Sequence, residues 1–487
     1  LEAISELVSE IPTVVDLIPG IVIEADDESA RVALEDEIIM LNLESVEWAN
    51  PYKTHNSRGP APELVSDVLN AGDVIRVSRA GEGWKLGQIP AASSALVSLN
   101  PEDGAITSLV GGFDFYSSKF NRVIQAYRQP GSSFKPFIYS AALEAGFTPA
   151  TTVNDAPVVF ENKQQGDAWR PQNYSGKFHG PTRLRQALTK SRNMVSIRLL
   201  RDIGRKFARD HAGKFGFDTD KLPKDLTLAL GSVAVTPLEL AEAYAVFANG
   251  GYKVEPYYIN RIEASDSAVL FLENPVRVCD EACMQLSLEV SLHDEELSEL
   301  GLTEPGEMND AEILVAPRVI PESNSYQMDS MLKDVIQYGT ARRAKVLNRT
   351  DIAGKTGTTN EQKDAWFAGY HPTAVTIVWV GFDDHEPLGR GETGGVAALP
   401  IWIDFMRVAL NEAPFIEPDL PAGMVVLKVD PNTGLIVDEH NPRGIEEAFS
   451  ESQIPGANWP GSSQAQPQQP PKVMIEGNSG SLPEQLF

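Results

Sequence analysis

Long apolar runs are absent from this sequence, and cysteine and positive charge are scarce. None of the 487 residues lies in an apolar run of 18 or more, so no segment has the length of a transmembrane helix. A secretory signal peptide is absent as well. Because the chain begins at Leu1 rather than at methionine, we expect a fragment of a longer protein whose N-terminal part, including a membrane anchor, is missing.

Only two cysteines occur, Cys279 and Cys283, and they lie four residues apart. Two thiolates cannot form a zinc site, and the nearest histidine, His293, does not complete a set of four ligands. A local disulfide is possible in an oxidising compartment, and two free thiols are the alternative. We expect no metal site and no cofactor.

Positive charge is outnumbered, with 41 Lys and Arg against 68 Asp and Glu, a formal net charge of −27 and a pI near 4.7. Such a surface repels phosphate backbones, which argues against nucleic acid as a partner. The 42% apolar content is that of a soluble globular protein, and the length allows two to four domains.

A lead-in of uncertain structure, residues 1–19, precedes a strand-rich segment at residues 20–94. Strands are predicted at 21–25, 30–34, 74–77 and 84–86, the last two joined by a turn at Gly81–Gly83. Several short strands in about 70 residues fit a small barrel of OB type. The segment is acidic and lacks a basic stripe with interleaved aromatics, which favours a protein-docking or spacer role.

The main domain is predicted at residues 95–420. Thr236 and Glu239 form a capping box at the start of a helix that ends near Asn249. Further elements are predicted from the apolar patterns: strands at 95–99, 105–110, 354–358, 365–370 and 374–381, and helices at 326–339 and 401–410.

Two segments interrupt or follow this domain. An acidic insert is predicted at about 263–325, where residues 294–296 and Glu299 are interpreted as a solvated helix or loop. A C-terminal tail, residues 421–487, contains a candidate hairpin around 430–434. Residues 454–471 are rich in Pro, Gln, Ser and Gly, so we predict disorder there.

The first candidate for chemistry is an S-x-x-K pattern formed by Ser132 and Lys135, at the start of a helix predicted to reach Leu143. Residues three apart on a helix share a face, so Lys135 can reach the Ser132 hydroxyl. A serine is a poor nucleophile until a base removes its proton, and lysine is such a base only when burial and nearby cations lower its pKa. Alone, the pattern also fits an ordinary surface helix.

Two further motifs follow. In Ser191-x-Asn193, the serine can relay a proton and the asparagine can hold a substrate amide with a donor and an acceptor. A K-T-G-T pattern occupies residues 355–358 on a predicted strand, whose edge can pair with an extended peptide. Each alone fits an ordinary loop or strand. Together, in this order, the three motifs form the signature of serine β-lactamases and penicillin-binding proteins.

The resemblance extends to other segments. These are residues 121–122 (Asn-Arg), 128–136 (Arg-Gln-Pro-Gly-Ser-Ser-Phe-Lys-Pro), 169–174 (Trp-Arg-Pro-Gln-Asn-Tyr), 229–232 (Ala-Leu-Gly-Ser), 236–239 (Thr-Pro-Leu-Glu) and 354–359 (Gly-Lys-Thr-Gly-Thr-Thr). They resemble class A (bifunctional) penicillin-binding proteins, and residues 20–95 resemble, less specifically, the OB-like insert of the penicillin-binding protein 1a group of Gram-negative bacteria.

This resemblance implies an α+β fold, with a five-stranded antiparallel sheet between helical layers and a small all-β OB-like domain. It implies a DD-transpeptidase that cross-links peptidoglycan and is inhibited by β-lactams. Ser132 would attack the D-Ala-D-Ala carbonyl of a stem peptide, and an amine from a neighbouring stem would take the acyl group.

The resemblance also implies roles for the other motif residues. Lys135 would be the base, and Ser191 and Lys355 would carry the proton to the leaving nitrogen. Asn193, Thr356, Gly357 and Thr358 would bind substrate: Asn193 the amide, and Thr356 and Thr358 the terminal carboxylate. The N–H groups of Ser132 and Thr358 would form the oxyanion hole.

Full-length members of the family also carry a glycosyltransferase domain and an inner-membrane anchor, and they work in the periplasm. We find neither segment in this sequence and expect the fragment not to polymerise glycan strands. A regulatory lipoprotein of the outer membrane is a candidate partner for the OB-like segment.

Three alternative functions remain open. A serine β-lactamase shares the motifs, but no Glu-x-x-Leu-Asn segment follows Asn193 to speed deacylation. A DD-carboxypeptidase differs only in using water as the acceptor. A non-catalytic penicillin-binding scaffold is opposed by the intact set of catalytic side chains.

Overall fold

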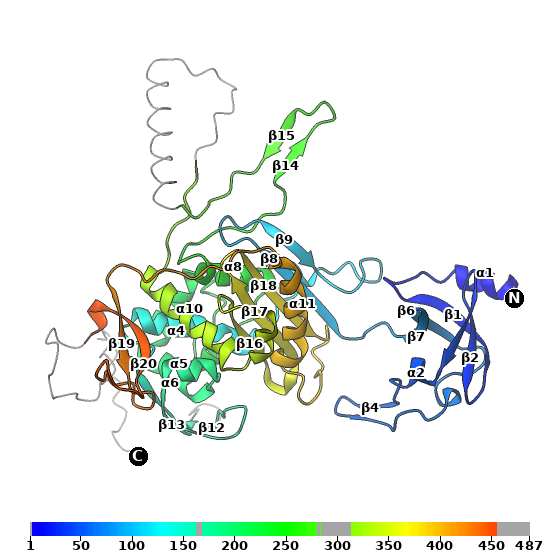
Figure 1. The fold of residues 1–487 in the computed structure, drawn as a ribbon, viewed down its shortest axis with the longest axis horizontal. Helices are drawn as coiled ribbons and strands as arrows, with labels where there is room; N and C mark the ends of the chain where they lie inside the picture. Colours follow the sequence, from blue (N-terminus) through cyan, green and yellow to red (C-terminus); the bar gives the residue numbers. More distant parts are fainter. Residues whose placement is uncertain (1, 162–167, 280–282, 284–312, 455–487) are drawn as a thin grey trace.

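The computed structural model describes residues 2–161, 168–279, 283 and 313–454. Figure 1 shows a small β-rich part, formed by the N-terminal residues, beside a larger body in which helices surround a second sheet. The prediction of an α+β fold with a small all-β domain is confirmed.

The N-terminal β unit, residues 2–92, is built on a five-stranded antiparallel sheet with strand order β3-β2-β1-β6-β7. Its strands are β1 (Ile18–Ala25), β2 (Ser29–Ala33), β3 (Ile38–Asn42), β6 (Val74–Ala80) and β7 (Gly83–Gly87). The predicted strands are confirmed, and β3 is an addition. Burial in β3 alternates along the strand, as expected when one face of a sheet covers a core.

Smaller elements complete this unit. They are α1 (Glu2–Ser9), α2 (Leu43–Val46), β4 (Tyr52–Thr54), β5 (Ser57–Arg58) and η1 (Val65–Asp67). Residues 1–19, whose structure was left uncertain by the sequence, contain the helix α1 and the first residues of β1. Val8 and Leu17 are buried, so this segment packs against its neighbours.

The larger body is organised around a second antiparallel sheet with strand order β16-β17-β18-β8-β9. The strands are β8 (Ser93–Leu99), β9 (Ile106–Val110), β16 (Ala353–Thr358), β17 (Asp364–His371) and β18 (Ala374–Gly381). All five were predicted from sequence. β16, which carries the K-T-G-T motif, lies at the edge of this sheet.

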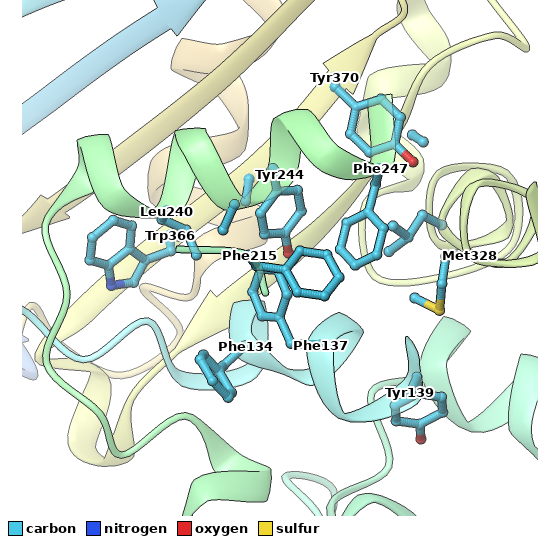
Figure 2. Packing of buried hydrophobic residues seen from close by; sticks show 14 of the residues in the cluster. Phe134, Phe137, Tyr139, Phe215, Leu240, Tyr244, Phe247, Met328, Trp366 and Tyr370 are labelled. Carbon is cyan, nitrogen blue, oxygen red and sulfur yellow. The ribbon is translucent and has the colours of Figure 1, made fainter. Parts of the chain in front are cut away.

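Helices cover both faces of the sheet. Trp366 and Phe367 are neighbours on β17 and therefore point to opposite faces. Trp366 lies beside Leu240 of α8 (Pro237–Ala248) in Figure 2, whereas Phe367 packs against Trp402 of α11 (Leu399–Ala409). The predicted arrangement of a sheet between helical layers is thus confirmed.

The body contains further helices and strands. They are α3 (Arg122–Gln125), η2 (Gly131–Phe134), α4 (Lys135–Glu144), β10 (Thr152–Asp155), β11 (Phe160–Glu161), β12 (Ala168–Trp169), β13 (Gly180–Arg183), α5 (Leu184–Thr189), α6 (Asn193–Ile203), α7 (Arg205–Gly213), η3 (Leu226–Leu230), α10 (Glu322–Gln337), η4 (Arg342–Leu347), η5 (Asn360–Gln362) and η6 (Gly394–Ala398). An aromatic cluster that includes Phe137, Phe215 and Phe247 joins α4, the segment just after α7, and α8 (Figure 2).

The start of α8 follows the predicted capping box: Thr236 Oγ1 accepts from Glu239 N, and the Glu239 carboxylate accepts from Thr236 N. α10 begins at Glu322, four residues before the predicted start. Asn324 and Ser325 are buried, so the last residues assigned to the acidic insert belong to the core instead.

The described part of the insert includes the hairpin β14 (Arg261–Glu263) and β15 (Val269–Leu272). Cys279 and Cys283 form a disulfide in the structure. The helix or loop predicted around residues 294–299 lies outside the described residues.

Residues 421–454 are folded onto the body. β19 (Met424–Val429) pairs with β20 (Ile445–Ser450), and η7 (Glu451–Gln453) follows. The predicted turn at 430–434 is present after β19, but the partner strand begins only at Ile445. Glu447 is buried and pairs with Arg185 at 2.5 Å. Of the segment predicted to be disordered, 454–471, all but Ile454 lies outside the described residues.

Candidate active site

The nucleophile turn contains Ser132, in η2 immediately before α4. Gly131 has a φ of +54°, a left-handed conformation that glycine adopts without strain. A Cβ atom at Gly131 would lie 2.7 Å from the carbonyl oxygen of Thr358, and one at Gly357 would collide with the Pro130 carbonyl oxygen. Glycine at both positions therefore lets the Ser132 turn press directly against β16.

Two lysines meet at the hydroxyl of Ser191. Lys135 Nζ lies 3.2 Å from Ser191 Oγ and donates to the Ser191 carbonyl oxygen at 2.8 Å. Lys355 Nζ lies 3.0 Å from the same Oγ and donates to the Thr356 carbonyl oxygen at 3.0 Å. The three motifs, separated by up to 220 residues, thus converge on one hydroxyl.

Both lysine side chains are completely buried. Burial lowers the pKa of Lys355 to about 7. Burial also holds the pKa of Lys135 well below its ordinary value, and the neighbouring charge of Lys355 lowers it further, while Asp155 acts in the opposite direction. Neutral amine is therefore accessible near neutral pH, which is what a lysine base requires.

The loop that carries Ser191 is held in an uncommon conformation. Ser191 has a φ of +56°, which is rare for a residue other than glycine and typical of functional sites. Asn193 follows as the first residue of α6, and its Oδ1 accepts from Lys135 Nζ at 2.7 Å. Its Nδ2 donates to the Gln172 carbonyl oxygen at 2.7 Å, which leaves one amide hydrogen for a substrate.

A cleft of about 930 Å³ opens over these groups. Ser132, Ser191, Asn193, Thr356 and Thr358 all line it, whereas Lys135, Lys355 and Gly357 do not line the cleft and are buried. The structure therefore brings together every residue predicted for catalysis and substrate binding.

The hydroxyls of the β16 threonines have protein partners. Thr356 Oγ1 lies 2.7 Å from Thr340 Oγ1, and Thr358 Oγ1 accepts from Gly394 N at 3.0 Å. Because that contact uses Thr358 as an acceptor, its hydroxyl hydrogen can still point to a ligand. β16 pairs only with β17 in this sheet, so its other edge is the natural position for an extended peptide.

The sequence did not predict the side chains that attach residues 128–129, just before the Ser132 turn, to β17. Arg128 Nε donates to Asp364 Oδ1 at 2.7 Å, and Trp379 Nε1 donates to the same oxygen at 2.9 Å. Trp366 Nε1 donates to the Gln129 carbonyl oxygen at 2.8 Å. Residues 128–129 were singled out only by resemblance, and Asp364 had no local signal at all.

Two family models match consecutive parts of the chain. The model of the penicillin-binding protein transpeptidase domain matches residues 94–407, and that of the penicillin-binding protein OB-like domain matches residues 1–92. The chain belongs to the penicillin-binding protein transpeptidase family.

Curated relatives of this transpeptidase chain carry the name penicillin-binding protein 1A. That of Pseudomonas aeruginosa is 48% identical over 464 residues, which cover 91% of this chain and 56% of the relative. That of Escherichia coli is 36% identical over 496 residues, covering 93% of this chain and 58% of the relative. The chain thus spans little more than half the length of these relatives.

Solved structures agree with this assignment. The crystal structure of penicillin-binding protein 1A from Haemophilus influenzae superposes with a TM-score of 0.81 at 36% identity, covering 94% of this chain and 66% of that one. PonA1 from Mycobacterium tuberculosis in complex with penicillin V gives 0.53 at 25% identity, covering 69% of this chain and 83% of that one.

Within the described residues, no three His, Cys, Asp or Glu side chains are grouped as metal ligands. In the same part of the chain, every helix is too short or too polar to cross a bilayer.

Proposed function

We propose that this chain is a DD-transpeptidase that cross-links peptidoglycan stem peptides through an acyl-enzyme on Ser132. The observation that carries the proposal is the contact of Ser191 Oγ with two buried lysine amines whose pKa values are lowered. A serine nucleophile, a neutral amine and a hydroxyl relay are the groups that acyl transfer from an amide needs.

In the acylation step, Lys135 takes the Ser132 proton as Oγ attacks the D-Ala-D-Ala carbonyl carbon. Negative charge develops on the carbonyl oxygen, where the N–H groups of Ser132 and Thr358 would stabilise it. The contact between Gly131 and the Thr358 backbone supports a shared position for these two donors. The C–N bond then breaks, and the proton passes through Ser191 and Lys355 to the departing D-Ala amine.

The second step reverses these roles. An amine from a second stem peptide attacks the acyl carbon, loses a proton to the same relay, and restores Ser132 as it forms the cross-link. Substrate would lie along the free edge of β16, with Asn193 at its amide and the hydroxyls of Thr356 and Thr358 at its terminal carboxylate. β-Lactams would acylate Ser132 in the same geometry, as the penicillin V complex of PonA1 supports.

A β-lactamase is less well supported, because it needs a base aimed at the acyl-enzyme to speed hydrolysis. The one acidic residue among the described residues that line the cleft is Glu361, which is 70% exposed and paired with Lys363. A carboxylate in that setting is poorly suited to activate a water molecule inside the cleft. This favours a long-lived acyl-enzyme.

The experiment that tests the proposal is incubation with a fluorescent penicillin, followed by mass spectrometry over hours, beside Ser132→Ala. We expect one long-lived adduct that is absent from the variant. Rapid loss of the label with accumulating hydrolysed drug would favour a β-lactamase instead, and absence of any adduct would favour a non-catalytic scaffold.

We further propose that the full-length protein is anchored in the inner membrane and works in the periplasm. The OB-like and transpeptidase domains, predicted at 20–94 and 95–420, are proposed to meet near residue 93, where the N-terminal β unit ends and β8 begins. We also propose an outer-membrane lipoprotein as a regulator bound through the OB-like domain, a role that its acidic surface without a basic stripe suits. A pull-down in which deletion of residues 20–95 leaves lipoprotein binding unchanged would refute the OB-like domain as the docking site.

A further inference from the structure

A buried carboxylate lies behind the active site and takes no part in the steps above. Asp155, at the end of β10, is fully buried, and β10 is fixed by its antiparallel pairing with β13. Its Oδ1 accepts from Asn173 Nδ2 at 2.7 Å. The nearest cation is Arg192, whose Nε lies 3.9 Å from Oδ2. A buried charge is costly to desolvate, so its presence here calls for a function.

Asn173 connects Asp155 to the first residues of α6. It is buried, and its Oδ1 accepts from the backbone N–H of Asn193 at 2.8 Å and, more weakly, from that of Met194 at 3.4 Å. Arg192, the residue that precedes α6, supplies no side-chain cap. Asn173 therefore caps this helix from a different segment of the chain and satisfies N–H groups that would otherwise lack partners.

Asn193 is consequently held at two points. Its backbone N–H is bound by Asn173, and its Nδ2 by the carbonyl oxygen of Gln172, the neighbouring residue. The other side-chain atom, Oδ1, is then directed at Lys135 Nζ. Three links connect Asp155 to the lysine: Asp155 to Asn173, Asn173 to Asn193, and Asn193 to Lys135.

We propose that Asp155 and Asn173 are positioning residues for the acylation reaction. Asp155 fixes the orientation of the Asn173 amide, and Asn173 holds the first turn of α6 so that Ser191 and Asn193 meet Lys135. This inference rests on the proposed function, because it assigns a role in acylation of Ser132. It gives the Trp-Arg-Pro-Gln-Asn-Tyr segment a task in the site, in addition to lining the cleft.

The charge of Asp155 predicts a second measurable effect, a change in the pKa of Lys135. Two charged groups act on Lys135: Lys355 from β16, and Asp155 from β10, which itself lies 3.9 Å from Arg192 Nε. Among these, Asp155 raises the pKa of Lys135 and Lys355 lowers it. Removing the Asp155 charge should therefore lower the pKa of Lys135, and neutral base would appear at lower pH.

The test measures the second-order rate constant of acylation by a fluorescent penicillin between pH 5 and 9 for Asp155→Ala and Asp155→Asn. Asp155→Ala should lower the plateau rate about 100-fold, because a misplacement near 1 Å has that effect. Asp155→Asn keeps an acceptor for Asn173 and should recover most of that loss. Its rising limb should move to lower pH, and scaling each profile to its own plateau removes any effect of the folded fraction.

Glu447→Gln is the matched control, since Glu447 is an equally buried carboxylate that pairs with Arg183 and Arg185 and lies outside the three links from Asp155 to Lys135. It should change thermal stability without moving the pH profile.

The outcomes are distinguishable. If Asp155→Asn recovers none of the rate that Asp155→Ala loses, the positioning role is overturned. If the limb of Asp155→Asn does not move, the influence of the Asp155 charge on Lys135 is overturned. If the wild-type protein itself forms no adduct that depends on Ser132, the proposed function fails first.

Discussion

The two domains differ in whether their charged side chains are exposed or buried. In the described residues of the N-terminal β unit, the buried side chains are apolar, and the ion pairs Arg31–Glu24 and Arg79–Glu37 are exposed. In the transpeptidase body, two lysines, Asp155 and the Arg128–Asp364 pair are buried.

Burying charge costs desolvation energy, and only a core assembled from many elements supplies the hydrogen bonds that offset it. The contrast therefore separates a domain built for binding surfaces from one built for chemistry. Where the charges are hidden, their pKa values shift toward neutrality and become useful to a reaction.

The largest effect is expected from removal of one buried lysine. Lys135→Ala should lower the rate of acylation by penicillin by about 10²–10⁴-fold, the usual contribution of a general base. Lys85→Ala, an exposed lysine of the N-terminal β unit, should leave the rate unchanged.

The pH dependence of wild-type acylation provides a check on the same comparison. The base must be neutral to accept a proton, and burial lowers the pKa of Lys135 and sets that of Lys355 to about 7. The rate should therefore rise from pH 5 toward neutrality. A flat profile, or one that rises only above pH 9, would contradict the claim that burial lowers the pKa of the lysine base.

Stability should respond unequally to loss of the two kinds of ion pair. Asp364→Ala leaves Arg128 buried without its carboxylate, which should cost about 3–5 kcal/mol in the free energy of unfolding. Glu37→Ala removes an exposed pair and should cost about 0–1 kcal/mol. Denaturant unfolding followed by tryptophan fluorescence measures the first, and circular dichroism the second. Equal costs would show that burial does not set the value of these pairs.

Close backbone packing offers a third, smaller contrast. Gly357→Ala places a methyl group against Pro130 and the Ser133 hydroxyl, so it should separate β16 from the nucleophile turn and slow acylation about 100-fold. Gly83→Ala, on β7, meets nothing closer than 3.7 Å and should be tolerated. Acylation rates and thermal midpoints of both variants measure this difference.

Local patterns in the sequence were sufficient for the elements with strong periodicity or caps. The apolar runs at 95–99 and 374–381 and the capping box at Thr236 each predict their own structure. β3 was missed because Ile38, Ile39, Met40 and Leu41 form a continuous apolar run without alternation. The helix near the N-terminus was missed because nothing at residues 1–19 indicates what it packs against.

The motif residues of the site could be predicted because their types and spacing are specific to one chemistry. The supporting residues could not. Asp155 is 18 residues from Asn173 and Arg128 is 236 residues from Asp364, so these contacts exist only after folding. The S-x-x-K motif required a lowered pKa for Lys135. The complete burial of Lys135 beside Lys355, which lowers that pKa, depends on tertiary contacts that the motif does not show.

The central claim is that Ser132 passes an acyl group from a D-Ala-D-Ala peptide to an amine. The direct measurement is mass spectrometry of a stem peptide ending in D-Ala-D-Ala, incubated with the protein and an acceptor stem peptide that carries a free amine, beside Ser132→Ala. The account predicts release of D-Ala and a cross-linked dimer that both depend on Ser132. Hydrolysed monomer without dimer would show water as the acceptor, and no release of D-Ala would contradict the account.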